Sequence, residues 1–473
     1  MKKETNLDNF VVLSDSYKFL HYLMYPENTQ VVNSYFEARE GATFDETVFF
    51  GLQYYLKKYF EGVVVTPEKV AFAEYLAGKH FGNDTYFNKA GWQYLIDKHG
   101  GRLPLRIKAV PEGTPVPTSN VMMTVENTDP DSPTPAYWLT NYAETILTHV
   151  WSASTVATLS RHVKKMIAKY VEKTAETDAG LPFMLHDFGF RGVSSVESAA
   201  YEGSGHLVNF MGTDTVPAIV CAMEYYDADV CGFSVPASEH SIMTALGEKG
   251  EREIIKRLIE KFPTGILSVV GDSYDIFRTT AELVGGEFKN QILERDGVYV
   301  VRPDSGEPVP TVLKVLDILG EKFKFTINKK GYKVLNPKVR VIWGDGLNYV
   351  MIENILKAMT KAGWSAENIV FGMGGGLLQK INRDTQRFAF KSCAQRRDGV
   401  WHDIWKDPVD KSKVSKRGRL ALVRLPEAAG GGYKTVQEAN APENVLQTVF
   451  EDGRILREYT FEEVRRNAAL KAA

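Results

Sequence analysis

Length, composition and charge exclude several classes of protein before any motif is considered. With 473 residues the chain is too long for one ordinary compact core, so we expect two domains. Hydrophobic residues make up 44% and charged residues 25%, as in a soluble globular protein, and the net charge of −2 indicates neither a nucleic-acid nor a membrane partner. The three cysteines have no CxxC spacing, the N-terminus lacks a signal-peptide pattern, and no window approaches about 18 apolar residues. We therefore expect a reduced, cytoplasmic protein.

The two ends of the chain mix strand and helix patterns. In the first 150 residues, alternating segments predict strands at 30–38, 102–110 and 119–128, and amphipathic segments predict helices at 46–62 and 70–81. Strand patterns return at 387–399 and 418–425. We expect one α+β domain built from both ends, residues 1–150 and 386–473, with a second domain over residues 151–385 inserted into it.

The middle of the chain repeats one pattern. A short apolar run is followed by polar or glycine-rich residues and then by a helical stretch, roughly every 30 residues, which is the length of a βα unit. The runs occupy 183–185, 206–210, 231–235, 266–270, 298–301, 339–343 and 368–371. Seven such units in series favour a closed or nearly closed α/β barrel with a parallel sheet. The polar residues after the strands are then expected on one face of the barrel.

Two of these strand ends suit an anionic sugar. Arg302 and Asp304, in RPDSG, can hold an acceptor oxygen and sugar hydroxyls, or can form a buried pair that braces a turn. The glycines at 374–376 can cradle phosphate oxygens with their N–H groups, or can form a flexible turn. Arg383 and Lys391 follow and can neutralise the same phosphate.

A histidine and a basic run complete the candidates. His240 follows Glu239 at the expected barrel mouth, where it suits a general base, a metal ligand, a phosphoryl acceptor or a hydrogen-bonded structural group. Asp272, at the next strand end, can orient the imidazole. The basic run 411–419, preceded by Lys406, is either a solvated loop or a polyphosphate site. It lacks interleaved aromatics, which disfavours nucleic acid.

A series of short segments, in order from residue 15 to about residue 419, resembles the nicotinamide phosphoribosyltransferases. The segments are DSYK (15–18), SYFEARE (34–40), HDFGFRG (186–192), HLVNF with GTDT (206–215), SVPASEH (234–240), GDSYDI (271–276), RPDSG (302–306), GDG (344–346), FGMGGGLLQK (371–380), FKSC (390–393) and KDPV (406–409). The resemblance implies a type II phosphoribosyltransferase fold, with an irregular α/β barrel, a second α/β domain and a homodimer whose active sites lie at the subunit interface.

The resemblance also implies residue roles at the pyridine ring. Tyr17 and Phe188, from opposite subunits, match the aromatic residues that sandwich the ring. Asp214 matches the carboxylate that accepts from the carboxamide NH2, and Ser268 and Arg302 match the groups that face its carbonyl. Because a carboxylate at Asp214 repels the carboxylate of nicotinate, nicotinamide is the preferred base.

The remaining roles concern sugar and phosphates. The positions that match ribose contacts are Asp304, Gly344 and Asp345, and those that match the 5′-phosphate site are Gly374, Gly375 and Arg383. The positions that match ligands of pyrophosphate or nucleotide phosphates are Arg39, Arg191, Lys391, Lys406 and Lys413. The spacing leaves open which lysine of 411–416 makes the last contact.

The implied enzyme is a pentosyltransferase of NAD salvage. It transfers the phosphoribosyl group of phosphoribosyl pyrophosphate to nicotinamide, with Mg2+ bound through the substrate phosphates. The resemblance assigns His240 as a phosphoryl acceptor from ATP, supported by Asp272 and Glu239. The nearest alternative is a nicotinate phosphoribosyltransferase. An aldolase would need a lysine at a strand end, and none is found; a non-catalytic binding protein would not need the set of His240, Asp272, Arg302 and Asp304.

Overall fold

The chain folds into two compact units. The computed structural model describes residues 7–426, 428, 431–441 and 443–470. The first unit, here called the sheet unit, takes its described residues from Met1–Thr158, Ala222–Ala228 and Asn382–Ala469. The second, the barrel unit, comprises Leu159–Cys221 and Asp229–Ile381, with residue 470. The sequence-based boundaries were 150 and 386, and the return of the chain to the sheet unit at 222–228 had no counterpart in the sequence analysis.

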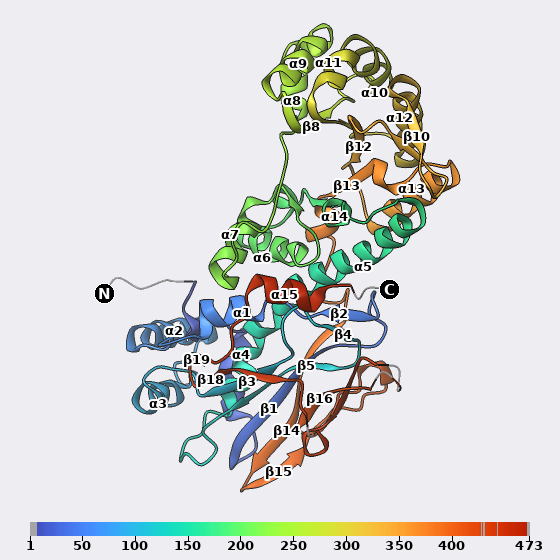
Figure 1. Cartoon of the computed structure of the whole chain (residues 1–473). Helices are drawn as coiled ribbons and strands as arrows, with labels where there is room; N and C mark the ends of the chain where they lie inside the picture. Colours follow the sequence, from blue (N-terminus) through green and yellow to red (C-terminus); the bar gives the residue numbers. More distant parts are fainter. Residues whose placement is uncertain (1–6, 427, 429–430, 442, 471–473) are drawn as a thin grey trace. The chain divides into compact units, whose positions relative to one another are not determined.

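An antiparallel sheet organises the sheet unit. Its order is β15-β14-β1-β5-β3-β18-β19, so three N-terminal strands lie in the middle and C-terminal strands flank them on both sides. Strand β1 (blue) lies beside β14 (orange) in Figure 1. The strands are β1 (Thr29–Ala38), β3 (Leu105–Ala109), β5 (Val121–Asn127), β14 (Phe388–Arg397), β15 (Val400–Asp403), β18 (Gln447–Glu451) and β19 (Arg454–Ile455). Two smaller pairs join β2 (Glu46–Val48) to β4 (Pro115–Pro117) and β16 (Leu420–Arg424) to β17 (Tyr433–Gln437). The strands predicted at 30–38, 102–110, 119–128, 387–399 and 418–425 are confirmed.

The helices of the sheet unit begin and end at local signals. In α2 (Pro67–Phe81) the Thr66 side chain accepts from the Lys69 N–H, Pro67 opens the first turn, and Gly82 closes the helix at φ 66°. The other helices are α1 (Leu52–Tyr55), continued by a π-helical turn (Leu56–Phe60), α3 (Lys89–His99), α4 (Trp138–Thr148) and α15 (Phe461–Ala468). The helix predicted over 46–62 is wrong at its start, because 46–48 pairs as β2 and the helix begins only after Gly51, at φ 103°.

A parallel sheet forms the core of the barrel unit. Six strands pair in the order β7-β6-β13-β12-β9-β8. They are β6 (Leu185–Asp187), β7 (Gly212–Thr213), β8 (Thr264–Val270), β9 (Asp296–Arg302), β12 (Val339–Trp343) and β13 (Ile369–Met373), and the side chains of their central residues are largely buried. Such apolar runs are typical of parallel strands covered on both faces.

An irregular segment closes this sheet into a barrel. Phe233 forms a parallel bridge to Gly212 beside β7, and Ala237 forms one to Ser268 in β8, so residues 233–237 join the two edge strands. The Ser268 N–H donates to the Pro236 carbonyl at 2.9 Å, and the Ser238 N–H donates to the Ser268 carbonyl at 3.0 Å. The predicted strand at 231–235 is therefore present only as isolated bridges, and the predicted irregular α/β barrel is confirmed.

Helices alternate with the strands of the barrel. They are α6 (Val196–Leu207), α7 (Val216–Tyr226), α8 (His240–Met243), α9 (Gly247–Lys261), α10 (Ile276–Arg278), α11 (Lys289–Glu294), α12 (Pro308–Phe323), α13 (Tyr349–Lys361) and α14 (Gly375–Leu378). Helix α5 (Val150–Thr174) begins in the sheet unit and continues into the barrel unit, and the last turns of α7, from Ala222, belong to the sheet unit. A small hairpin pairs β10 (Phe325–Ile327) with β11 (Lys333–Leu335). No helix in the described part of the chain has the length and apolar character needed to cross a membrane.

One predicted strand of the barrel is wrong. Residues 206–207 complete α6, which the Ser195 side chain caps by accepting from the Ser198 N–H, and the strand that follows is only Gly212–Thr213. The His206 ring is fully buried, with Nδ1 at 3.0 Å from the Ser160 hydroxyl and Nε2 at 3.1 Å from the Gly212 carbonyl. A short apolar run at a buried helix end has the same composition as a buried strand, which is why the pattern misled.

Candidate active site

A cavity of about 1130 Å³ opens at the carboxyl ends of the barrel strands. Its walls come from the residues that follow five of the strands, as expected for an α/β barrel. The predicted site residues that line it are Phe188, Arg191, Asp214, Glu239, Arg302, Asp304, Gly344, Asp345, Gly374 and Gly375. Residues nearly 190 positions apart in the sequence thus meet in one volume.

The aromatic part of the cavity is built on β6. The Phe188 N–H donates to the Met373 carbonyl at 3.0 Å, which ties this residue to the end of β13. Asp187 is fully buried and accepts from the Gly189 N–H at 2.7 Å, so its carboxyl holds the turn that carries Phe188. Burial raises the pKa of Asp187 to about 6, against its hydrogen bond from Gly189. Sequence analysis did not assign Asp187, although HDFGFRG contains it.

The carboxylate of Asp214 also faces the cavity. It follows β7, and the Ser234 hydroxyl donates to it from the closing segment of the barrel. This hydrogen bond fixes one carboxylate oxygen and leaves the other for a ligand. Ser268, by contrast, is only 4% exposed inside β8 and is not among the residues that line the cavity.

His240 stands between two carboxylates. Its Nε2 lies 2.9 Å from Asp272 Oδ1 and its Nδ1 lies 4.0 Å from Asp304 Oδ2. The Ser305 hydroxyl donates to the other oxygen of Asp272 at 2.5 Å. Asp272 is nearly buried, whereas the His240 side chain is 47% exposed. A buried carboxylate therefore holds the imidazole, and the rest of the ring remains accessible. The Glu239 carboxylate accepts from the Ser241 hydroxyl. The two carboxylates beside the imidazole are those of Asp272 and Asp304.

Arg302 and Asp304 form a loose pair at the end of β9. Arg302 Nε lies 3.8 Å from Asp304 Oδ1 and is a buried donor without a hydrogen-bond partner. Burial raises the pKa of Asp304, the Arg302 guanidinium opposes this, and the carboxylates of Asp272 and Asp345 raise it further. The unpartnered donor and the crowded carboxylates indicate a site arranged for a ligand rather than a closed ion pair.

The other predicted contacts belong to the sheet unit. Burial lowers the pKa of Lys391; Glu144 opposes this, while the nearby charges of Lys406, Arg39 and Arg383 lower it further. Three cations therefore lie close enough to Lys391 to act on its charge, and a group of this kind can attract an anion. Tyr17 is 57% exposed on a 3-10 helix (Ser16–Leu23) of the same unit.

The basic run 411–419 is partly neutralised by its own surroundings. Lys416 pairs with Glu37, which is only 3% exposed, and its N–H donates to the Tyr35 hydroxyl at 2.8 Å. Lys413 pairs at 3.2 Å with Asp410 on the surface, where both side chains are about half exposed. Since exposed pairs contribute little, Lys413 can exchange its partner for a phosphate at small cost, whereas Lys416 is held in place.

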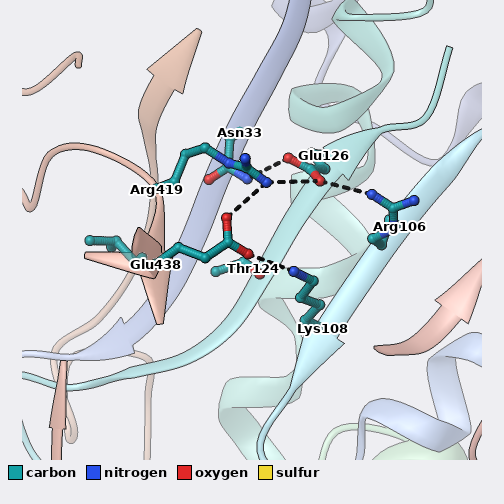
Figure 2. A pocket seen from close by; sticks show the side chains of 8 residues that line it. Asn33, Arg106, Lys108, Thr124, Glu126, Arg419 and Glu438 are labelled. Atoms are coloured by element: carbon teal, nitrogen blue, oxygen red, sulfur yellow. Dashed lines mark hydrogen bonds and ion pairs between the residues drawn. The ribbon is translucent and has the colours of Figure 1, made fainter. Parts of the chain in front are cut away.

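A second, very small pocket lies on the main sheet of the sheet unit (Figure 2). Arg419 reaches Glu438 at 2.8 Å and Glu126 at 3.8 Å, Arg106 pairs with Glu126 at 3.3 Å, and Lys108 pairs with Glu438 at 2.7 Å. Outside this view, Arg106 also pairs with Glu451 at 2.6 Å. The cations and carboxylates balance, and the volume of about 10 Å³ suits one water molecule. We interpret this cluster as an ion network that connects strands.

No group of three or more His, Cys, Asp or Glu side chains in the described ranges is arranged to hold a metal ion. Carboxylate oxygens nevertheless line the cavity, on Asp304 and Asp345. Such oxygens, together with the oxygens of a polyphosphate, are the ligands that Mg2+ prefers.

Comparison with protein families gives two matches along the chain. The model of the nicotinate phosphoribosyltransferase family matches residues 183–454, and that of the nicotinamide phosphoribosyltransferase N-terminal domain matches residues 9–107. A nicotinamide phosphoribosyltransferase of Xanthomonas campestris pv. campestris is 46% identical over 472 residues, covering 98% of each chain. One of Acinetobacter baylyi is 34% identical over 492 residues, covering 96% of each.

Solved structures share the fold at low sequence identity. The nicotinate-nucleotide pyrophosphorylase of Pyrococcus furiosus superposes with a TM-score of 0.60 at 15% identity, covering 99% of this chain and 97% of that one. Human nicotinic acid phosphoribosyltransferase gives 0.56 at 15% identity, covering 97% and 93%. The fold agrees with these structures, and the sequence matches extend over both units. The chain belongs to the nicotinate phosphoribosyltransferase family and, within it, to the nicotinamide phosphoribosyltransferases.

Proposed function

We propose that this chain transfers the phosphoribosyl group of phosphoribosyl pyrophosphate to nicotinamide, giving nicotinamide mononucleotide and pyrophosphate in NAD salvage. The observation that carries the proposal is the content of the barrel cavity. One volume combines an aromatic ring and a carboxylate, Phe188 and Asp214, with carboxylates suited to sugar hydroxyls and glycines suited to a phosphate. The names of the sequence relatives agree with this reading.

The base is recognised by complementary hydrogen bonding. The free oxygen of Asp214 accepts from the carboxamide NH2, while the unpartnered Arg302 Nε is available to the carboxamide oxygen. The Phe188 ring stacks on the pyridine, and we assign the second face to Tyr17 of the partner subunit in a homodimer. Nicotinate would place its carboxylate against Asp214, a like-charge contact in a partly desolvated site.

The sugar and phosphates are held beyond the base. We assign the ribose hydroxyls to Asp304 and Asp345, beside Gly344, and the 5′-phosphate to the first N–H groups of α14 at Gly374 and Gly375, which have no partner inside the helix. Arg191, and Arg383 with the cation cluster of the sheet unit, are assigned to phosphate oxygens. Mg2+ bound to the substrate pyrophosphate would neutralise charge on the leaving group.

The chemical step needs positioning and charge neutralisation but no general base. The pyridine nitrogen already carries a lone pair, so it attacks the anomeric carbon as the C–O bond to pyrophosphate breaks. His240 therefore has no acid–base task in the transfer. We assign it as the acceptor of a phosphoryl group from ATP, whose hydrolysis then drives synthesis of the mononucleotide.

One set of assays tests this function. The purified protein is incubated with phosphoribosyl pyrophosphate, Mg2+ and either nicotinamide or nicotinate, with and without ATP, and the mononucleotides are separated by chromatography. We expect nicotinamide mononucleotide as the main product and faster synthesis with ATP. A preference for nicotinate would overturn the role of Asp214 and favour the nicotinate enzyme; we further expect Asp214→Asn to reduce the preference for nicotinamide by about tenfold or more.

A further inference from the structure

The Phe188 ring sits against two glycines on neighbouring strand ends. A Cβ built on Gly372, in β13, would lie 2.0 Å from Phe188 Cε2 and 2.3 Å from Cδ2. A Cβ built on Gly344, just after β12, would lie 3.0 Å from the same Cε2. A methyl group at Gly372 therefore overlaps the ring, and one at Gly344 is tight against it.

Neither glycine is required by the backbone. Gly344 and Gly372 are both outside the set of residues with positive φ, so alanine can adopt their backbone conformation. The three atoms nearest to the Cβ position of Gly372 all belong to the Phe188 ring, with no backbone atom among them. The space that glycine leaves at this position is taken up by Phe188.

Contacts of the main chain and contacts of the ring edge together fix the position of Phe188. Its backbone is tied to β13, because the Phe188 N–H donates to the Met373 carbonyl, and a Cβ on Gly374 would lie 3.3 Å from the Phe188 carbonyl oxygen. Its edge enters the space above Gly372 and Gly344. With the main chain fixed, an obstructed ring has to turn or rise toward the cavity that it lines.

We propose that Gly372 is a positioning residue for base binding: with Gly344 it forms a slot that seats the Phe188 ring at the depth needed to stack on the substrate pyridine. The proposal rests on the function proposed above, in which Phe188 supplies one stacking face. A planar base held by stacking tolerates little displacement of the ring, and small misplacements at a reacting centre reduce rates strongly.

The test is a double-mutant cycle between Gly372→Ala and Phe188→Ala, read as KM for nicotinamide. We expect Gly372→Ala alone to raise this KM about tenfold, and KM for phosphoribosyl pyrophosphate to change less than about twofold. In the Phe188→Ala background the added methyl has no ring to displace, so Gly372→Ala should change KM for nicotinamide by less than about twofold. Gly180→Ala is the matched control, because a Cβ there meets nothing within 4 Å.

The outcomes are distinguishable from failure of the proposed function. Absence of nicotinamide mononucleotide with the unmodified protein would overturn that function. If the unmodified protein is active, an unchanged KM in Gly372→Ala, or an equal loss in both backgrounds, overturns the slot. If Gly372→Ala fails to fold, a double variant that folds and shows a cooperative thermal unfolding transition supports the slot. A double variant that is equally unfolded overturns it.

Discussion

The two ring nitrogens of His240 have different neighbours. The Ser305 hydroxyl donates to one oxygen of Asp272, and the other oxygen lies 2.9 Å from His240 Nε2. Because a carboxylate only accepts, Nε2 donates its hydrogen to Asp272 in this contact. Nδ1 faces Asp304 at 4.0 Å and the open side of the site. In the phosphoryl transfer proposed above, the nitrogen left for the phosphoryl group is Nδ1.

This geometry predicts the position of the phosphoryl group. On incubation with ATP we expect phosphate on His240 Nδ1, identified by NMR or by antibodies that distinguish the two phosphohistidine isomers. Asp272→Asn removes the negative charge and no longer imposes one tautomer, so ATP hydrolysis should fall on the order of 10- to 100-fold. In His240→Ala, the ratio of mononucleotide synthesis with ATP to that without should fall to one. Full ATP coupling in His240→Ala would contradict the assignment.

The sequence predicted ten of the 23 residues that line the cavity, because chemistry and order along the chain both pointed to them. Asp304 and Gly375 both lie near a strand end. Asp304 offers a carboxylate there, and Gly375 offers a backbone N–H. Ser305 and Gly372 were missed, because a serine in a turn and a glycine in a strand have no distinctive pattern of their own. Their roles depend on which side chain lies opposite, and that follows only from the fold. The family, the barrel and the pentosyltransferase class are confirmed; the individual residue roles remain predictions.

At the scale of elements, regular strands were predictable and the barrel closure was not. The runs at 266–270 and 339–343 are rich in β-branched residues and mostly buried, with Ile266 exposed at the start of the first, so composition and structure largely agree. Residues 233–237 join the barrel through isolated bridges, which leave little periodicity in the sequence. Here a side chain supplies a hydrogen bond in place of the regular backbone pairing between strands. The Ser238 hydroxyl, 3% exposed, accepts from the Val270 N–H at 3.0 Å.

Removing that hydroxyl should loosen the closure of the barrel. In Ser238→Ala the buried Val270 N–H loses its acceptor, a cost of about 1–3 kcal/mol. We expect the amides of β8 to exchange hydrogen about tenfold faster or more, measured by mass spectrometry of peptides covering 264–270. Exposed Ser194→Ala serves as the control. Equal rates of hydrogen exchange in the two variants would show that this hydrogen bond contributes nothing to the closure of the barrel.

At the scale of the whole molecule, the two chain ends contribute strands to one sheet. Strand patterns at both ends, separated by the βα repeats, led us to expect one α+β domain from the two ends. Which strands pair followed only from the structure, in which β1 and β14 pair over nine residues of register. The residues of the proposed active site are also divided between the two units. Base, ribose and phosphohistidine residues belong to the barrel unit, whereas Tyr17 and the cation cluster belong to the sheet unit.

The proposed homodimer makes this division testable by complementation. Tyr17→Ala disables the sheet-unit contribution and Asp304→Ala the barrel-unit contribution. If each active site takes Tyr17 from one subunit and Asp304 from the other, a mixed dimer has one doubly altered site and one intact site. Coexpression in equal amounts gives half mixed dimers, so activity at low nicotinamide should recover to about a quarter of that of the unmodified protein. Coexpressed Asp214→Ala and Asp304→Ala should show no recovery, because each site of the mixed dimer then carries one defect. Mixed dimers of Tyr17→Ala with Asp304→Ala that are verified by mass spectrometry yet remain inactive would show that each site is built from a single chain.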